Sequence, residues 1–232
     1  MSLSVGVLII GSLIWDSERA AWRESRLQRD SSLPVTAPIR YGRKSASRGD
    51  TYTTVFSRGC PAGQALVVPC VSVVSSAEDL VTEAEHLWAA ERKSETRVHA
   101  VSASWGCITL LPNPGVAVPQ SILNGWAKRI ASETAYGNVQ QAGGEGQLVS
   151  NAGLLQIDWP RLGRESENRL PDLLLATTTQ PTLLGSPSDC PSVEMIAHAW
   201  NADGDNNVEY FRQNTAHGIR TFQNDAIRGQ LL

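Results

Sequence analysis

The first apolar run of the chain is interrupted in a way that a purely structural strand does not need. Residues 5–10 read VGVLII and are short, apolar and rich in β-branched side chains, which favours a buried strand. The run breaks at Gly11-Ser12, resumes at residues 13–15 and meets a carboxylate at Asp16. Glycine lets a backbone approach a ligand closely, and successive free N–H groups after a strand make an anion- or oxyanion-binding concavity. A β-bulge is the alternative, and the local sequence alone favours it.

The composition restricts the class of protein and its partners. Of the 232 residues, 41% are hydrophobic and 19% are charged, which is typical of a globular chain. Its length suits one domain with elaborations, or one and a half domains. A net charge of −3 gives no basic surface for DNA or RNA, so a nucleic-acid partner is not expected. The opening apolar run is shorter than the ~20 residues that span a bilayer and lacks the basic segment of a signal peptide. We therefore expect a cytoplasmic protein without a membrane partner.

The four cysteines are expected to be reduced, partly buried thiols. Cys60, Cys70, Cys107 and Cys190 are widely spaced and include no C-x-x-C pair. A chain of this length does not need disulfides for its stability. No histidine clusters with a cysteine, so the sequence gives no indication of a metal site.

Periodicity and turn residues predict strands and helices along the whole chain. Strands are expected at 5–10, 37–47, 51–57, 63–74, 97–111, 154–159 and 172–179. Helices are expected at 76–92, 120–136 and 206–232, and a short helix or loop at 17–29. Pro69 marks its strand as an edge strand or a bulge, and Gly218 weakens the last helix by about 1 kcal/mol. The pattern favours an α+β fold around a closed or nearly closed mixed sheet.

The helix that follows Ser76 carries the most informative polar residue. Ser76 and Asp79 have the spacing of a capping box, which predicts the start of the helix. Steps of four, three and four residues from Leu80 bring Glu91 onto the apolar face, and Trp88 flanks that face. Burial there would raise the pKa of Glu91 by desolvation and suit it to proton transfer near neutral pH.

A simpler interpretation of Glu91 stays open, and the spacing alone favours it. The helix frays near its end, and the carboxylate pairs in solvent with one of the nearby cations, Arg92, Lys93 or Arg97. Glu83 and Glu85 point away from the apolar face and are expected to be solvated.

A serine or cysteine nucleophile is the weakest of the catalytic hypotheses. Ser12 or Cys107 with His217 or His99 as the base is chemically conceivable, but no spacing favours the combination. Ser12 does not belong to a G-x-S-x-G elbow, because Ile9 occupies the position of the first glycine.

Several motifs follow the interrupted strand in a defined order. Behind GSLIWD come the Arg- and aromatic-rich stretch RYGRKSASRGDTYTTV, then GQALVV, then a helix of the form DL…L-x-x-x-E that ends at residues 87–91. Together, residues 5–111 resemble the γ-glutamylcyclotransferase-like superfamily, whose first strand ends in Tyr-Gly-Ser-Asn or Tyr-Gly-Ser-Leu. Its ChaC-type branch often continues to Ile/Leu-Trp, as this chain does. The motif tyrosine corresponds to Ile10 here, and residues from about 112 match no pattern of the family.

The resemblance implies an architecture and a place for the site. The family fold is a small closed or nearly closed β-barrel with surrounding helices and a cavity at the end of the first strand. Residues 1–111 would form this barrel core. Residues 112–232 would be a C-terminal, helical elaboration that completes the same domain.

The resemblance also implies a reaction. In the family, the free α-amine of a γ-glutamyl group attacks its own side-chain amide carbonyl, and 5-oxoproline and an amine are released. Glu91 would be the catalytic acid/base, and the backbone of Gly11, Ser12 and Leu13 would donate to the oxyanion or the α-carboxylate. The reaction requires neither a metal nor an organic cofactor, and its partner is a small-molecule substrate.

Further residues are candidates for substrate binding beside the expected pocket. Arg43 and Arg48 lie on the strand pair next to it and have the geometry to bind a carboxylate, although arginines on an edge are more often surface residues. Trp15 and Trp88 are candidates for the pocket wall, although seven tryptophans in one chain mostly indicate core filling.

Two functions therefore remain open at the level of the sequence. The first is a cyclotransferase-type enzyme, a lyase or acyltransferase acting on a γ-glutamyl or similar amide. The second is a non-catalytic small-molecule-binding or interaction protein on the same fold, which the loss of the motif tyrosine to Ile10 motivates. The leaving amine and the oligomeric state are not defined by the sequence.

Overall fold

The computed structural model describes most of the chain. The described residues are 2–45, 49, 51–94, 96–136, 139, 147–163, 169–181, 190–202 and 205–231. Among the helices of these residues, none is long and apolar enough to cross a membrane. The four cysteines are free thiols, and Cys70 and Cys107 are buried.

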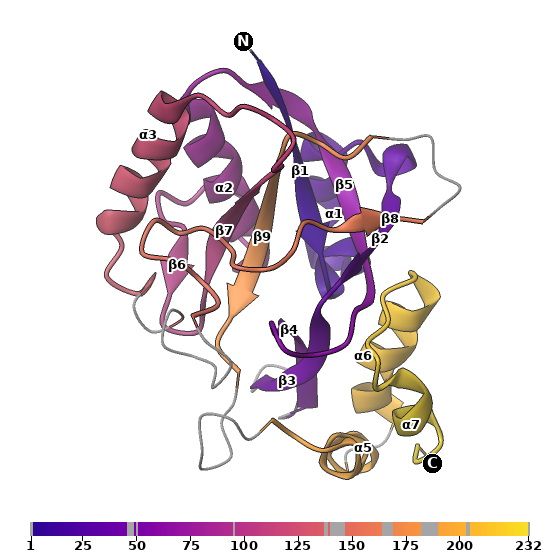
Figure 1. Ribbon diagram of the computed structural model, residues 1–232. Helices are drawn as coiled ribbons and strands as arrows, with labels where there is room; N and C mark the ends of the chain where they lie inside the picture. Colours follow the sequence, from indigo (N-terminus) through magenta and orange to yellow (C-terminus); the bar gives the residue numbers. More distant parts are fainter. Residues whose placement is uncertain are drawn as a thin grey trace.

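A seven-stranded mixed sheet forms the centre of the molecule (Figure 1). Its strands in spatial order are β6 (Ser102–Ala103), β7 (Gly106–Pro112), β9 (Leu173–Thr179), β1 (Leu3–Ile9), β5 (Gly63–Val74), β2 (Leu33–Ala37) and β8 (Arg161–Leu162). Neighbouring strands are antiparallel except β1 and β9, which are parallel. The α+β class is therefore confirmed. The sheet ends at β6 and β8 within the described residues, so the expected barrel closure is not found.

The interrupted strand lies at the middle of this sheet. β1 pairs with β5 on one side and β9 on the other, which buries its side chains on both faces and explains the nearly unbroken apolar run. β5 also pairs with β2, so Pro69 does not lie on an edge strand. The bulge interpretation is correct instead, because the β1–β5 register shifts between Ser4 and Gly6, where Pro69 lacks an N–H to donate.

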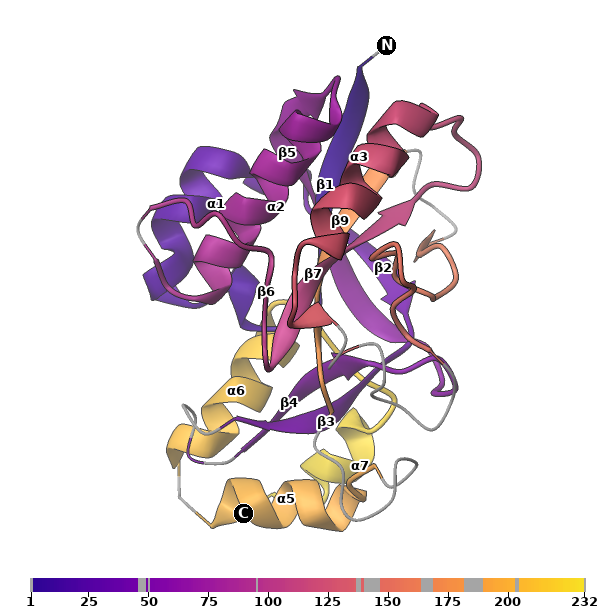
Figure 2. The same cartoon turned by 90° about the vertical axis from the view of Figure 1, so that its left-hand side faces the viewer.

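A second, two-stranded sheet stands below the end of β1 in Figure 1. β3 (Ile39–Ser45) and β4 (Thr51–Phe56) pair antiparallel, close to their predicted bounds. The C-terminal helices α5 (Val193–Asn201), α6 (Asp205–Ala216) and α7 (Asn224–Arg228) gather beside this hairpin, at the end of the molecule opposite the N-terminus (Figures 1 and 2). Hairpin and helices share a separate apolar cluster: Tyr41, Tyr52, Ile196, Trp200, Val208, Tyr210, Phe211 and Ile227.

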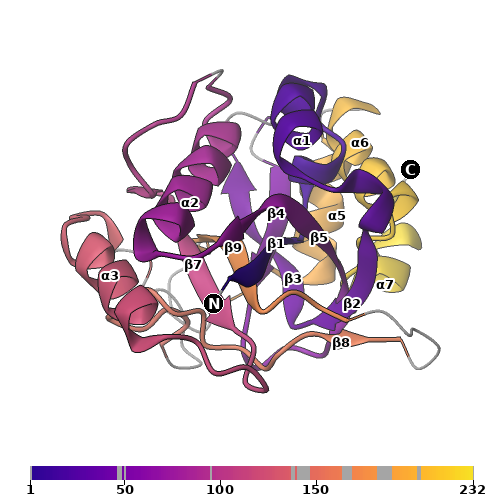
Figure 3. The ribbon, with the colours of Figure 1, turned by 90° about the horizontal axis from the view of Figure 1, so that it is seen from above.

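The remaining helices flank the large sheet. From above, α2 (Ala77–Glu91) and α3 (Gln120–Ala131) lie side by side on one flank, and α1 (Ala20–Arg26) lies next to α2 (Figure 3). The predicted capping box starts α2, since Ser76 and Asp79 each accept from the other's backbone N–H.

Several predicted elements differ from the structure. The strand expected at 97–111 is two strands, because a turn at Ser104-Trp105 separates β6 from β7. The segment expected as a strand at 154–159 makes only isolated bridges. The last helix is split, because Gly218 has a φ of 78°, which ends α6 before α7 begins. No prediction covered α5, and α3 ends earlier than expected, at Ala131.

The predicted boundary at residue 111 remains a prediction about domains. The large sheet itself takes strands from both sides of that boundary, since β9 and β8 lie beyond it and β9 is the parallel neighbour of β1. The C-terminal residues thus contribute to the sheet as well as adding the helices of α5–α7.

Candidate functional site

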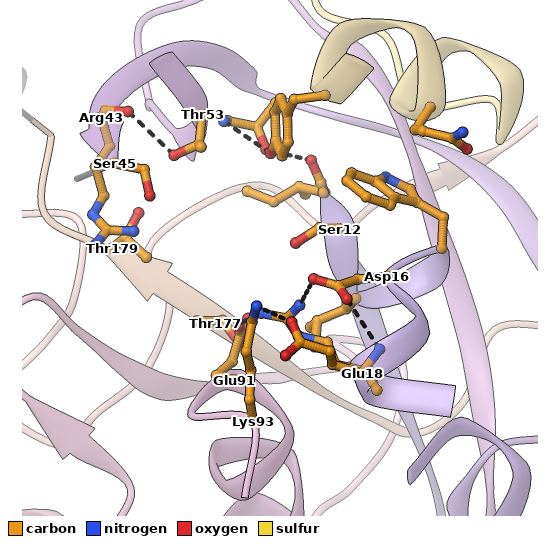
Figure 4. A pocket seen from close by; sticks show the side chains of 18 of the residues that line it. Ser12, Asp16, Glu18, Arg43, Ser45, Thr53, Glu91, Lys93, Thr177 and Thr179 are labelled. Carbon is orange, nitrogen blue, oxygen red and sulfur yellow. Dashed lines mark hydrogen bonds and ion pairs between the residues drawn. The ribbon is translucent and has the colours of Figure 1, made fainter. Parts of the chain in front are cut away.

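A cavity of about 720 Å³ opens at the end of β1. Its walls come from the turn after β1, the end of α2, the β3–β4 hairpin, the end of β9 and one face of α6 (Figure 4). Of the seven residues predicted for the site, six line this cavity: Gly11, Ser12, Leu13, Trp15, Arg43 and Glu91. Trp88 does not line it. Arg48 lies outside the described residues.

Glu91 is the last residue of α2 and reaches the cavity with a largely buried side chain, 14% exposed. Its Oε2 lies 3.5 Å from Nη2 of Arg19, a side chain that is itself 6% exposed. Two of the three expected partners are engaged elsewhere: Lys93 pairs with Glu18, and Arg97 pairs with Glu85. The third, Arg92, is exposed and forms no ion pair with Glu91 among the described residues. The prediction that Glu91 lies in solvent at a frayed helix end is therefore wrong, and so are the partners predicted for it.

The turn after β1 is held by a group of buried charges that sequence reasoning missed. Asp16 forms an ion pair with Arg19 and accepts from the Glu18 N–H at 3.1 Å. Arg23 donates to the carbonyl oxygens of Leu13 at 2.9 Å and of Asp16 at 2.7 Å. Burial lowers the pKa of the Arg23 guanidinium below its ordinary value. The sequence contains a signal for this group of charges. Arg19 and Arg23 follow Asp16 by three and seven residues, and Asp16 comes soon after a strand.

The break at Gly11 has a different cause from the one expected. Residues Ser12–Ile14 form a short 3₁₀ turn, so the local alternative of a β-bulge is wrong at this position. Gly11 has an extended φ of −166°, which any residue adopts. A Cβ there would lie 2.6 Å from Oη of Tyr210 and 3.0 Å from Oγ1 of Thr54. Glycine is thus required because the Tyr210 hydroxyl packs against the backbone.

The same turn presents free backbone donors. The N–H groups at the start of a 3₁₀ turn have no acceptor inside the turn. Within the described part of the chain, no acceptor is found for the N–H of Ser12 or of Leu13, while Ile14 and Trp15 donate back into the turn. Because the turn lines the cavity, these two amides are available to an anionic or carbonyl oxygen.

Helix α6 brings a tyrosine hydroxyl to the position next to Ile10. Oη of Tyr210 accepts from the Thr54 N–H at 3.3 Å and lies 2.9 Å from Oγ1 of Thr54. The Thr54 hydroxyl in turn donates to the carbonyl oxygen of Ile10. The ring of Tyr210 meets Trp15 edge-on at 5.9 Å, and Trp15 donates to Asn214 of the same helix at 2.8 Å. A phenol is therefore present at this end of the cavity although position 10 is isoleucine.

Arg43 lies on the opposite side of the cavity from Glu91 (Figure 4). Its guanidinium stands 4.9 Å from the ring centre of Trp105, which stacks at 4.8 Å on Trp88. Trp88 is fully buried, so Trp105 takes the place in the wall that was predicted for Trp88. Burial lowers the pKa of Arg43, and the charge of Glu91 partly opposes this. No carboxylate among the described residues pairs with the Arg43 guanidinium, which leaves it for a ligand.

The other catalytic hypotheses find no support in the described residues. Cys107 is fully buried away from the cavity, and burial raises the pKa of its thiol far above the ordinary value. His99 faces Glu85 and His217 contacts the Gln213 backbone, and neither lines the cavity beside Ser12. A nucleophile–histidine pair is therefore not assembled.

Glu83 and Glu85 of α2 are buried, not solvated as predicted. Glu83 forms an ion pair with Arg26 of α1. Glu85 lies 3.1 Å from Arg97 and 3.7 Å from Arg129 of α3. Both were predicted to lie in solvent because only the apolar face of the helix was expected to be covered. In the structure, α1 and α3 also cover the flanks of α2.

Comparison with known proteins adds no family assignment. No protein-family model matches the chain, and no curated protein or solved structure shows significant similarity to it. The geometry of the cavity and the motif order of residues 5–111 are therefore the features of this chain that bear on its function.

Proposed function

We propose that this chain is a cyclotransferase-type enzyme that acts on a γ-glutamyl or similar amide and releases 5-oxoproline and an amine. The observation that carries the proposal is the meeting of Glu91 with the free amides of Ser12 and Leu13 in one cavity. These groups come from motifs that are almost eighty residues apart in the sequence, and they supply the two functions that the reaction needs.

The reaction is an internal acyl transfer that consumes no water. The substrate ammonium gives a proton to the carboxylate of Glu91, and the resulting amine nitrogen attacks the γ-carbonyl carbon. The carbonyl oxygen becomes negatively charged and accepts from the N–H groups of Ser12 and Leu13. The bond from this carbon to the leaving nitrogen then breaks while Glu91 returns its proton to that nitrogen. Glu91 next takes the second proton of the ring nitrogen and passes it to the released amine. The products are the neutral cyclic amide and an ammonium ion.

Arg43 and the size of the cavity fit a substrate that extends beyond a single glutamyl group. Because Arg43 faces the cavity from the side opposite Glu91 and has a flat guanidinium supported by Trp105, it suits a planar carboxylate of the ligand. The proposal does not require barrel closure, since the cavity is bounded by the end of the sheet, the β3–β4 hairpin and α6.

A second candidate function is a small-molecule-binding protein that uses the same cavity without catalysis. The contact that favours it is the Arg19–Glu91 ion pair, because a carboxylate with its own cation also serves as a fixed binding group. This candidate predicts that γ-glutamyl compounds raise the melting temperature and are recovered unchanged after incubation.

The test is product analysis with purified protein. γ-Glutamyl amino acids, γ-glutamylamines and glutathione are incubated with wild type and Glu91→Gln, and 5-oxoproline is quantified. We expect turnover of at least one substrate class and a loss of about 10²–10⁴-fold in the variant, the range for removal of a general acid/base. Absence of 5-oxoproline with every substrate, or equal rates for the two proteins, contradicts the mechanism.

A further inference from the structure

The proposed reaction leaves two buried charges of the cavity without a role, Asp16 and Arg19. Both side chains are about nine-tenths buried, and both line the cavity next to Glu91. Burying a charged group is costly unless it is paired, so a buried charge at a cavity wall needs a partner. Arg19 has two: Nη1 pairs with Oδ2 of Asp16, and Nη2 lies 3.5 Å from Oε2 of Glu91.

We infer that Asp16 and Arg19 are positioning residues that hold Glu91 for an ammonium group of the ligand. Asp16 fixes the guanidinium of Arg19, and the other arm of that guanidinium fixes Oε2 of Glu91. Oε1 of Glu91 has no partner among the described residues and is left to accept from the ligand. The identity of this ligand as an amine-bearing amide rests on the proposed function.

The free oxygen of Glu91 suits a cationic hydrogen-bond donor of the ligand. A carboxylate oxygen binds an ammonium group more strongly than a neutral donor, because the hydrogen bond is assisted by charge. Lys93 pairs with Glu18, and Arg43 faces the cavity from the opposite side, so neither occupies this oxygen.

The turn that carries Asp16 is itself fixed, so the arrangement is built before any ligand arrives. Arg23 ties the carbonyl oxygens of Leu13 and Asp16 together with one nitrogen. The free amides of the turn and the carboxylate of Glu91 are thereby held to a common frame. Preorganised groups of this kind need not be ordered at the moment of reaction, which is their main contribution to rate.

A purely structural role, in which the ion pairs only join the turn to α2, is the competing explanation. The chain provides a matched control, because Arg26 of α1 forms an ion pair with Glu83 on the same helix α2, and neither residue lines the cavity. If the Arg19 pair is only a clamp, the loss of either arginine has the same consequences.

The experiment compares Arg19→Met, Arg19→Lys, Asp16→Asn and the control Arg26→Met. kcat and KM are measured with the best γ-glutamyl substrate, and melting temperatures are recorded for each protein. We expect kcat to fall by on the order of 10²-fold in Arg19→Met, because the reacting carboxylate is no longer aligned, and Arg19→Lys to recover part of this loss. Asp16→Asn, which keeps the acceptor for the turn, raises KM. Arg26→Met lowers the melting temperature and leaves kcat within about twofold.

A binding measurement separates this inference from the proposed reaction. L-Glutamine and N-acetyl-L-glutamine differ in the charge of the amine, and their affinities are compared for each protein by calorimetry. Preference of the wild type for L-glutamine, weakened in Asp16→Asn and Arg19→Met but not in Arg26→Met, supports the inference even if no 5-oxoproline forms. No such preference in the wild type, or equal behaviour of the Arg19 and Arg26 variants in kcat and binding, overturns it.

Discussion

Two ion pairs join the helical residues 17–26 to α2. The surroundings of their two glutamates differ. Arg26 pairs with Glu83 between packed helices, and Arg19 pairs with Glu91 about two helical turns further along. The glutamates are similarly buried, with side chains 6% and 14% exposed. Only the second pair lines the cavity and has a free carboxylate oxygen there. Burial and pairing therefore do not set the two carboxylates apart. Access to a cavity with further polar groups does, and it is the reason why Glu91 and not Glu83 is proposed as the proton carrier.

The largest expected difference between the two pairs is the response to an isosteric amide. Glu91→Gln removes the proton carrier and lowers kcat by about 10²–10⁴-fold, with little change in stability. Glu83→Gln leaves Arg26 without its partner and lowers the free energy of unfolding by about 1–3 kcal/mol, with kcat unchanged. Steady-state kinetics and chemical unfolding of both variants measure this. A loss of kcat in Glu83→Gln equal to that in Glu91→Gln removes the basis for separating the pairs.

At the cavity, α6 packs against the turn after β1 through Tyr210 and Gly11. The variant Gly11→Ala tests this contact. The new methyl group would lie 2.6 Å from Oη of Tyr210, so the variant is overpacked and loses about 1–3 kcal/mol of stability. Adding Tyr210→Phe removes the clashing oxygen and restores part of this loss. Thermal unfolding of the single and double variants is the measurement. An equally destabilised double variant would show that the Tyr210 hydroxyl is not the reason for glycine.

A smaller effect is expected on the far side of the cavity from Glu91. Arg43→Lys keeps the positive charge but loses the flat contact with Trp105 and the two-pronged geometry toward a carboxylate. We expect KM for a carboxylate-bearing substrate to rise by roughly tenfold while kcat is nearly constant. A matched substrate without that carboxylate should not respond. A fall in kcat alone would place Arg43 with the reacting groups and not with ligand binding.

The smallest effect uses Cys70 as a reporter of the structural pair. Burial raises the pKa of this thiol to about 12; the charge of Glu83 adds to the rise and that of Arg26 opposes it. The thiol is thus protonated and unreactive at neutral pH. Glu83→Gln removes a charge that disfavours the thiolate, so the pKa falls and alkylation of native Cys70 becomes faster at alkaline pH. Glu91→Gln should leave the alkylation rate unchanged, as measured by mass spectrometry of the labelled protein.

The sequence predicted those elements whose reasons are local. The strands β1 and β9 are apolar runs buried on both faces, and β5 is buried in the same way over residues 65–68. The capping box of α2 needs only two side chains three residues apart. The short strands β2 and β8 were missed, and β6 was merged with β7 into one strand, because short strands depend on pairing partners more than on their own residues. Six of the seven candidate site residues line one cavity, and that this cavity is a functional site stays a prediction.

The partners that define the site could not be predicted from spacing. Helical periodicity placed Glu91 on a face of α2, but it gave no information on what covers that face. Arg19 lies 72 residues away from Glu91 in the sequence, and Tyr210 reaches Gly11 from α6 near the other end of the chain. The same limit explains why Glu83 was assigned to solvent, although Arg26 covers it.

The most direct test of the central claim follows the products of one γ-glutamyl substrate in water enriched in heavy oxygen. A cyclotransferase with Glu91 as proton carrier releases 5-oxoproline and the amine in equal amounts, and neither product contains oxygen from water. This is the result we predict for the wild type, with both products formed about 10²–10⁴-fold more slowly in Glu91→Gln. Release of glutamate that carries heavy oxygen would identify hydrolysis instead, and recovery of intact substrate would identify a binding protein; either result contradicts the proposed reaction.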